Sequence, residues 1–582
     1  MPAGASNETG TSLSPAQHPW VASYPPGVSW DQHFTPRPLY TLLDEAVAAH
    51  AHRPCTNFLG KVTTYGEIGD LVDRAAAGLQ KLGFGRGSRI GLFLPNSPTY
   101  LVYYYAILKI GGIVVNYNPL YAVEELIKQV KDSETELMVT LDLAVLFEKV
   151  EALLKAGVLP RAVVCSFPGL LPATKSILFR MFKGKQLAQV NKSPVADRII
   201  FEAEVLGNGG RPELPPIDPE NDLAVLQYTG GTTGIPKGAM LTHANLYVNV
   251  LQVAAFAPEL ETARHRVLAV LPFFHVFAMT VVLNFGVMKA AEMILMPRFV
   301  LEEAMELIED LKPSILPGVP TLFNALMNHP RFASLDVSSL RYCLSGGAAL
   351  PVEVKQRFEK MTGCKLVEGY GLSETSPVVT ANPLEGPDKP GSIGLPVPRT
   401  IISLRDLADP TREVPMGERG ELCVRGPQVM KGYWRQPEET ANQMVDGFFR
   451  TGDVAVMDED GYFYLVDRIK DLIISSGYNV YPRRIEEAIY QHPAVEEVSV
   501  IGIADERRGE APKAFIKLKE GMSATAAEIL AHLEPKLSRI EMPVEIEFRS
   551  ELPKTLIGKP SKRDLKLEEA DRRKAKEREA QA

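Results

Sequence analysis

The spacing of hydrophobic residues alternates between helical and strand patterns along most of the chain. Apolar positions three and four residues apart predict helices at 65–83, 97–111 and 122–133. Short apolar runs predict buried strands at 89–95, 112–119 and 136–142. Because strands and helices alternate here, this part of the chain predicts a parallel sheet covered by helices.

A second alternating series is expected from 222 to about 380. Its first strand, 222–229, is followed by a helix at 243–257. Further strands are expected at 266–272, 292–297, 314–320 and 340–347. From about 390 to 466 the pattern changes to short strands with frequent Gly, which indicates a small β unit. A smaller α+β unit follows Asp467.

The amino-acid composition distinguishes the two ends of the chain from the rest and argues against one class of protein, the nucleic-acid binders. Residues 1–37 are rich in Pro, Ser and Gly and predict an extended arm, while 566–582 read as a solvated, charged tail. Of the 582 residues, 45% are apolar and 23% charged, as in ordinary globular proteins with several structural units. The net charge of −8 argues against nucleic-acid binding.

Five scattered cysteines, with no CxxC pair, indicate neither a disulfide framework nor a metal site. The first 20 residues lack a basic start followed by an apolar run, and no apolar stretch of membrane-spanning length occurs. We therefore expect a cytosolic protein.

The stretch "YTGGTTGIPKGAM" at 228–240 has the composition of a phosphate-binding loop. Glycines let backbone N–H groups approach an anion, and the threonines and Lys237 add donors and charge. It is not a Walker P-loop, because Ile235 and Pro236 separate Gly234 from Lys237. Alone, such a loop is also compatible with a plain strand-to-helix turn.

Three further motifs follow in order: "YGLSETSP" at 370–377, "FFRTGDVAVMDEDGYFYLVDRIKD" from 448, and "LPKTLIGKPSKRDL" at 552–565. Together with the loop they resemble the adenylate-forming enzymes: acyl-CoA synthetases, firefly-type luciferases and peptide-synthetase adenylation domains. The resemblance covers roughly 40–565 and is greatest to bacterial long-chain fatty acyl-CoA synthetases. It implies an α/β fold, with a large N-terminal domain (38–469) of two α/β subdomains plus a β subdomain, and a small mobile α+β C-terminal domain (470–565).

The resemblance also assigns roles. Glu374 would bind Mg²⁺, Ser373 would lie near the α-phosphate, and Lys559 would contact the α-phosphate and the substrate carboxylate. Tyr370 would stack on adenine, and Asp453, helped by Arg468, would accept hydrogen bonds from the ribose. The remaining ATP-binding candidates are Thr229, Gly230, Gly231, Thr232, Thr233, Gly234, Lys237, Gly346, Gly347, Ala348 and Gly371. Singly, each of these residues is also compatible with a core, turn or surface role.

Three other regions receive roles in the same way. His275 and Phe277, in "LPFFHVFAM", would border the acyl pocket, although His275 is also compatible with a core position. No Asp lies between 271 and 279, which favours a plain carboxylic acid over an amino acid. Lys470 would be the hinge between the domains. Near "SSGYNVYPRR" the CoA candidates are Gly477, Arg483 and Arg484, although the arginines could simply solvate a helix start.

The function expected is AMP-forming ligation of a long-chain fatty acid to CoA, with ATP and CoA as co-substrates and Mg²⁺ as cofactor. The alternatives are a ligase that loads a carrier protein, a luciferase-like oxygenase, and a non-catalytic lipid-binding scaffold at a membrane. The segment 175–192 carries five basic residues and no acidic one, with an apolar edge at Ile177, Leu178, Phe179, Met181 and Phe182. It predicts peripheral contact with anionic membranes, or otherwise a solvated hairpin. A homodimer is left open.

Overall fold

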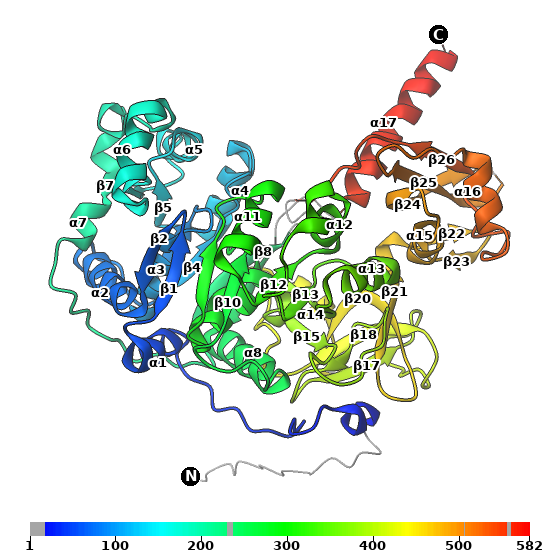
Figure 1. Ribbon diagram of the computed structural model, residues 1–582, viewed down its shortest axis with the longest axis horizontal. Helices are drawn as coiled ribbons and strands as arrows, with labels where there is room; N and C mark the ends of the chain where they lie inside the picture. Colours follow the sequence, from blue (N-terminus) through cyan, green and yellow to red (C-terminus); the bar gives the residue numbers. More distant parts are fainter. Residues whose placement is uncertain (1–17, 230–236, 506, 556–559, 582) are drawn as a thin grey trace.

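A computed structural model describes residues 18–229, 237–505, 507–555 and 560–581, with side chains of the last helix as far as Ala575. Two helix-covered sheets lie side by side in a large domain, and a small domain lies beside its β subdomain (Figure 1). This agrees with the expected fold class, a large α/β domain followed by a small α+β domain.

The first sheet has the strand order β7-β6-β5-β3-β4-β8-β9, and only the β8–β9 pair is antiparallel. Its strands are β3 Arg89–Leu92, β4 Ile113–Asn116, β5 Leu137–Leu141, β6 Arg161–Cys165, β7 Ile199–Phe201, β8 Leu223–Thr229 and β9 Lys237–Thr242. The helices of this part are α1 Thr41–His50, α2 Tyr65–Lys81, α3 Pro98–Lys109, α4 Val123–Ser133, α5 Ala144–Lys155, α6 Ala173–Phe182 and α7 Glu202–Leu206. Helix α2 starts at a capping box, in which Thr64 and Glu67 satisfy each other's backbone N–H groups.

The second sheet has the order β16-β15-β14-β13-β12-β10-β11-β1-β2. Its strands are β1 Pro54–Phe58, β2 Lys61–Thr64, β10 Arg266–Ala269, β11 Glu292–Leu295, β12 Ile315–Gly318, β13 Tyr342–Ser345, β14 Lys365–Gly371, β15 Val378–Ala381 and β16 Leu395–Pro396. The helices that follow β9 are α8 His243–Phe256, α9 Val276–Ala278, α10 Phe285–Met288, α11 Leu301–Leu311, α12 Pro320–Asn328 and α13 Val352–Thr362.

The two sheets exchange strands, which corrects one prediction. We assigned 222–229 to the second series, but β8 pairs with β4 of the first sheet, with Val225 opposite Val114. Conversely, β1 pairs with β11 of the second sheet, with Thr56 opposite Met293. Both pairings join strands far apart in the sequence, and the local hydrophobic pattern carries no information about such partners.

The β subdomain contains β17 Ile401–Arg405, β18 Gly420–Arg425, β19 Met444–Val445, β20 Phe448–Met457 and β21 Phe463–Arg468, with α14 Pro437–Asn442. The described part of the predicted arm packs against this unit. It includes a 3-10 turn, Pro19–Ser23, and buries Trp20 and Trp30. Trp30 Nε1 donates a hydrogen bond to the Thr400 carbonyl at 3.2 Å. This part of the arm is therefore attached to the fold by its indole rings.

The small domain is a sheet of β22 Ile473–Ser475, β23 Tyr478–Val480, β24 Val495–Asp505, β25 Gly509–Leu518 and β26 Glu545–Phe548. Helices α15 Pro482–Tyr490 and α16 Ala526–Leu533 belong to this domain. The charged tail forms most of a long helix, α17 Lys562–Gln581, that projects from the domain (Figure 1). Among the described residues no helix is long and apolar enough to cross a membrane.

Candidate active site

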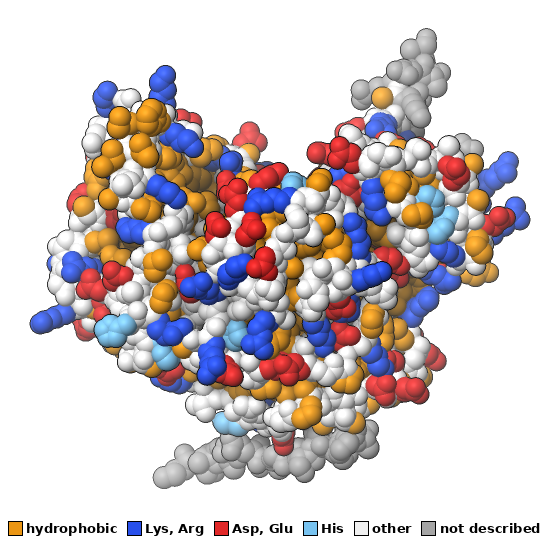
Figure 2. Space-filling view, in the orientation of Figure 1, with side chains coloured by type: hydrophobic (Ala, Val, Ile, Leu, Met, Phe, Trp, Pro, Cys, Tyr) orange, Lys and Arg blue, Asp and Glu red, His pale blue; other side chains and the backbone are white. Residues whose placement is uncertain are grey.

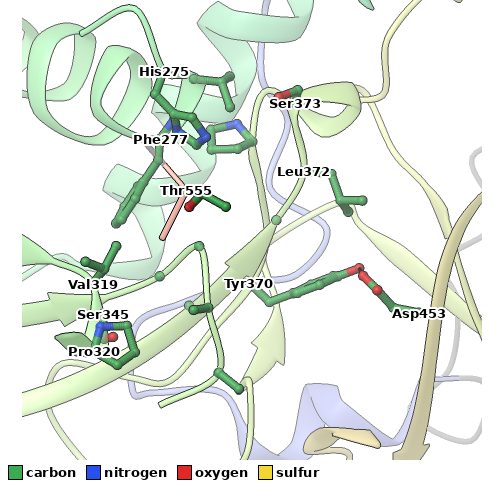
Figure 3. Close-up of a pocket in the computed structure, with 18 of the residues that line it drawn as sticks. His275, Phe277, Val319, Pro320, Ser345, Tyr370, Leu372, Ser373, Asp453 and Thr555 are labelled. Atoms are coloured by element: carbon green, nitrogen blue, oxygen red, sulfur yellow. Dashed lines mark hydrogen bonds between the residues drawn. The ribbon is translucent and has the colours of Figure 1, made fainter. Parts of the chain in front are cut away.

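A cavity of about 1850 Å³ lies where the sheets of the large domain meet the small domain. The strands β8, β13 and β14 end at it, and residues from β20, β21 and the small domain complete its wall. Ligands of parallel α/β sheets bind at the carboxyl ends of the strands, so this is the expected position for a site. Figure 3 shows Tyr370, Ser373, His275 and Phe277 around one part of it.

Tyr370, Asp453 and Arg468 form one hydrogen-bonded group. The Tyr370 hydroxyl donates to Asp453 Oδ2 at 2.7 Å, and Arg468 Nε donates to Oδ1 at 3.0 Å. Strands β20 and β21 are paired so that Asp453 lies opposite Arg468. Burial of the Tyr370 hydroxyl, together with the charge of the buried Asp453 carboxylate, raises the pKa of Tyr370. Tyr370 therefore remains a hydrogen-bond donor, and the carboxylate stays at the cavity wall (Figure 3).

Glu374 and Ser373 lie together on a 3-10 turn, Ser373–Thr375, after β14. The Tyr433 hydroxyl donates a hydrogen bond to Glu374 Oε1 at 2.8 Å. Ser373, Glu374 and Tyr433 all line the cavity. Mg²⁺ is commonly held by one carboxylate, with phosphate oxygens and waters as the other ligands. The described residues contain no cluster of three or more His, Cys, Asp or Glu side chains suited to a metal. Glu374 thus fits a magnesium ion that arrives with a polyphosphate.

Lys237 begins β9, next to the glycine-rich loop, and lines the same cavity. Its ammonium forms an ion pair with Glu439 of α14 and lies 5.3 Å from the centre of the Tyr433 ring. Thr229 ends β8 on the other side of the loop and donates to the Lys237 carbonyl at 3.5 Å. The remaining loop candidates, Gly230, Gly231, Thr232, Thr233 and Gly234, lie outside the described residues.

Phe277 and His275 form part of an apolar wall opposite Tyr370 (Figure 3). His275 Nδ1 accepts the Phe277 N–H at 3.3 Å, and enclosure by neighbouring side chains lowers the His275 pKa to about 4. The ring is therefore neutral near pH 7. Gly346 lies so close that a Cβ there would meet Phe277 at 3.1 Å. The apolar lining continues through Val253, Phe256, Leu260, Val267, Val281, Phe285, Ile315, Val319 and Leu344.

The loop after β13 and the end of β14 supply the remaining large-domain candidates. Gly346, Gly347 and Ala348 follow β13 and line the cavity, and Gly347 has a positive φ of 75°. Gly371 ends β14, where a Cβ would meet the Pro377 carbonyl oxygen at 2.0 Å. A side chain at 371 would therefore displace the backbone of the turn that carries Glu374.

The small domain reaches into the cavity. Thr555 and Pro560, on either side of the undescribed residues 556–559, line it, and Thr555 lies between Phe277 and Tyr370 in Figure 3. Lys559 itself is outside the described residues. Lys562 pairs with Glu486 at 2.9 Å, and the nearby Glu486 and Asp467 raise the pKa of its ammonium.

Lys470 lies on a 3-10 turn, Ile469–Asp471, between the domains. It lines the cavity, and desolvation together with Arg468 lowers its pKa. The CoA candidates are separated: Gly477 is in the turn between β22 and β23, and Arg484 pairs with Glu541 at 3.3 Å. Arg483 instead lines the cavity, and its backbone N–H donates to Asp467 at 2.8 Å.

Sequence reasoning missed three residues of this site: Tyr433, Glu439 and Glu368. Tyr433 and Glu439 occur in "KGYWRQPEET" at 431–440, where only their proximity to Glu374 and Lys237 reveals a role. Glu368 is buried beside Arg483, and burial raises its pKa to about 7. An acidic residue directly after the buried pair Leu366 and Val367, in the strand "KLVEGYG", was the available signal for Glu368.

Known proteins match this chain over nearly its whole length. The profile of the AMP-binding enzymes matches residues 43–434, and that of the AMP-binding enzyme C-terminal domain matches 484–559. A long-chain-fatty-acid–CoA ligase of Bacillus subtilis is 43% identical over 563 residues, 96% of this chain and 99% of that protein. Its counterpart in Yersinia pestis is 41% identical and covers 91% of this chain and 94% of its own length.

Solved structures agree. An anthranilate CoA ligase in complex with anthranoyl-AMP has a TM-score of 0.81 and 26% identity, covering 92% of this chain and 98% of its own. ATP-bound MatB from Rhodopseudomonas palustris has a TM-score of 0.79 and 29% identity, with 91% and 98% covered. From the order of its motifs, its two-domain fold and these matches, the chain belongs to the AMP-binding, adenylate-forming enzyme family.

Proposed function

We propose that the protein is an AMP-forming long-chain fatty acid:CoA ligase. The observation that carries the proposal is a single cavity that joins two environments. One part has the Asp453, Glu374 and Lys237 charges, and the other is an apolar wall that begins at Phe277. The relatives named as long-chain-fatty-acid–CoA ligases, at 37–43% identity, support this substrate class.

In the first step a fatty carboxylate oxygen attacks the α-phosphorus of ATP, and pyrophosphate leaves. Lys237 and the glycine-rich loop would hold the departing phosphates, while Lys559 would face the α-phosphate and the acid. Asp453 would accept hydrogen bonds from the ribose hydroxyls. Arg468 Nε donates to Asp453 Oδ1 at 3.0 Å and holds the carboxylate in position. Tyr370 would support the adenine, next to Gly346, Gly347, Ala348 and Gly371. Ser373 would donate near the α-phosphate.

A magnesium ion bound at Glu374 would offset the phosphate charge. Tyr433 holds Oε1 of this carboxylate at 2.8 Å, so the carboxylate is oriented by a fixed donor. Neutral His275 and Phe277 would border the acyl chain. A neutral imidazole suits that place, since a charge beside the chain would carry a desolvation cost.

In the second step the CoA thiol attacks the acyl carbon, and AMP leaves with the electron pair of the broken C–O bond. Thr555 and Pro560, the described neighbours of the Lys559 loop, line the cavity in this arrangement, and the CoA thiol would have to reach the same cavity. Rotation of the small domain about Lys470 would withdraw the loop. Gly477, Arg483 and Arg484 remain our CoA-binding candidates, although Arg483 is enclosed in this arrangement.

The alternatives differ in what becomes of the adenylate, or in whether one forms at all. A carrier-loading ligase would need a carrier protein, a luciferase-like enzyme would need oxygen, and a scaffold would release no pyrophosphate. The test is pyrophosphate release with saturated acids of increasing length, ATP, Mg²⁺ and CoA. We expect turnover that requires CoA and is greatest with long chains. No turnover with any chain length, or turnover indifferent to CoA, would overturn the proposal.

A further inference from the structure

Helix α6, Ala173–Phe182, exposes an apolar face that no described part of the chain covers. The exposed fractions are 60% for Ile177, 52% for Leu178, 70% for Met181 and 78% for Phe182. These positions are spaced i, i+1, i+4 and i+5, so they share one face of the helix. Figure 2 shows an apolar area with Lys and Arg around it at the upper left, where Figure 1 places α6.

The helix is fixed to the protein by its other side. Phe179 is half-buried and packs on Phe167, with ring centres 5.0 Å apart, so it does not belong to the apolar edge predicted from sequence. Lys175 Nζ donates to the Leu59 carbonyl at 2.8 Å. Because these contacts hold α6 in place, its apolar face is presented outward in one orientation.

The charged residues of the segment 175–192 all have one sign. Arg180, Lys183, Lys185 and Lys192 are exposed, and 175–192 contains no acidic residue although the whole chain has a net charge of −8. An exposed apolar helix face whose own segment carries only basic charges matches an anionic bilayer, in which the apolar groups enter the acyl boundary and the cations meet headgroups.

Short contacts also connect this region to the active-site cavity. Leu187, just beyond α6, pairs with Leu143 at the start of α5. On α5, Lys149 Nζ donates to the carbonyls of Pro119 and Tyr121, at 2.9 Å each. Leu120 and Tyr121 line the cavity, and Leu120 is 69% exposed. A series of short contacts therefore connects the helix with the apolar face to Leu120, an exposed apolar residue at the cavity wall.

We propose that α6 docks the protein on an anionic lipid bilayer, so that the cavity near Leu120 collects fatty acid from the membrane. The use of the collected acid rests on the proposed ligase function, whereas docking does not. Each basic residue near an anionic surface contributes about fivefold to partitioning, and loss of a buried Phe on the order of tenfold.

The test is co-sedimentation of the full chain with vesicles of phosphatidylcholine alone and with phosphatidylglycerol added. The charge variant is Arg180→Glu, Lys183→Glu and Lys185→Glu, which leaves the Lys175 contact intact. The apolar variant is Met181→Ser with Phe182→Ser. Matched controls are Lys360→Glu, Arg412→Glu and Arg539→Glu, and Met416→Ser with Met522→Ser, all exposed residues elsewhere.

We expect wild type and both controls to bind the anionic vesicles. Binding should fall at least 100-fold in the charge variant and at least tenfold in the apolar variant, with unchanged melting temperatures. Equal binding by all proteins, or equal binding to neutral vesicles, would overturn the proposal. The proposal would also be overturned if wild type were a dimer and the apolar variant a monomer that binds vesicles equally well, since a second copy of the chain would then cover α6.

A second readout separates docking from catalysis. With palmitate embedded in vesicles, thioester formation should fall in both α6 variants. With octanoate in solution, it should be unchanged. Failure of wild type to ligate either acid would contradict the ligase function but leave the vesicle result standing. Equal use of vesicle palmitate by all variants would overturn the delivery role.

Discussion

Tyr433 is predicted to orient the carboxylate that would hold magnesium, and Tyr433→Phe removes only that interaction. The hydroxyl donates to Glu374 Oε1 at 2.8 Å, while the backbone N–H of Tyr433 donates to Thr440 Oγ1 at 2.9 Å. The ring should therefore stay in place and keep its contact with the Lys237 ammonium, at 5.3 Å from the ring centre. Met430 N–H also still holds the backbone of Glu374 at 2.8 Å.

The size of the effect follows from the bond that is lost. A hydrogen bond to a charged group contributes about 1.5–3 kcal/mol, and the lower half of this range applies to a half-buried pair. The free Mg²⁺ needed for half-maximal adenylation should therefore rise about 10- to 30-fold. Outer-shell partners of metal ligands typically have effects of this size. The maximal rate at saturating Mg²⁺ should stay near that of wild type.

The assay is pyrophosphate release against free Mg²⁺ at constant ATP and fatty acid. Tyr464→Phe is the matched control. The Tyr464 hydroxyl donates a hydrogen bond to Asp458 Oδ2 at 3.0 Å, and neither residue lines the cavity. The same Mg²⁺ curve for Tyr433→Phe and wild type would show that Tyr433 does not orient the metal-binding carboxylate. An equal shift in Tyr464→Phe would show that the effect is general instability.

Three further predictions concern the step order and pH. Lys559→Ala should slow adenylation by about 10²–10³-fold, while thioester formation from pre-made acyl-adenylate survives; equal loss of both half-reactions would contradict its role. Lys470→Pro should retain adenylation and slow the CoA step strongly, because proline restricts the φ change a hinge requires; unchanged acyl transfer to CoA would show that no hinge turns there. Glu368 has a pKa of about 7 through burial, so between about pH 4.5 and 7 the folded protein keeps a proton that the unfolded chain loses. The contribution of Glu368 to the free energy of unfolding should therefore fall as pH rises through this window. The melting temperature of wild type should fall relative to that of Glu368→Gln, which has no proton to lose at this position; a pH-independent difference between the two proteins would contradict this pKa.

The order of elements was predictable, whereas the pairing of strands was not. Strands such as β5 and β13 appear as short apolar runs, and their helices as repeats three and four residues apart, so the α/β class followed from local pattern. That β8 pairs with β4, and β1 with β11, depends on contacts between distant segments. Local periodicity carries no record of such contacts.

The site shows the same division. Asp453 and Glu374 could be proposed because they stand in ordered motifs, and the structure places both at one cavity. Tyr433 and Glu439 could not, because nothing in the local sequence shows that they approach Glu374 and Lys237. Phe179 was misplaced for a related reason: an apolar run on a short helix does not say which ring faces Phe167.

Two-step activation of the acid through an adenylate fixes the stoichiometry of the products. Purified protein is incubated with palmitate, ATP, Mg²⁺ and CoA, and AMP, ADP and palmitoyl-CoA are quantified together. We expect one AMP for each palmitoyl-CoA, no ADP, and palmitate-dependent exchange of pyrophosphate into ATP when CoA is omitted. Formation of ADP, or of thioester without any pyrophosphate exchange, would rule out activation through an adenylate.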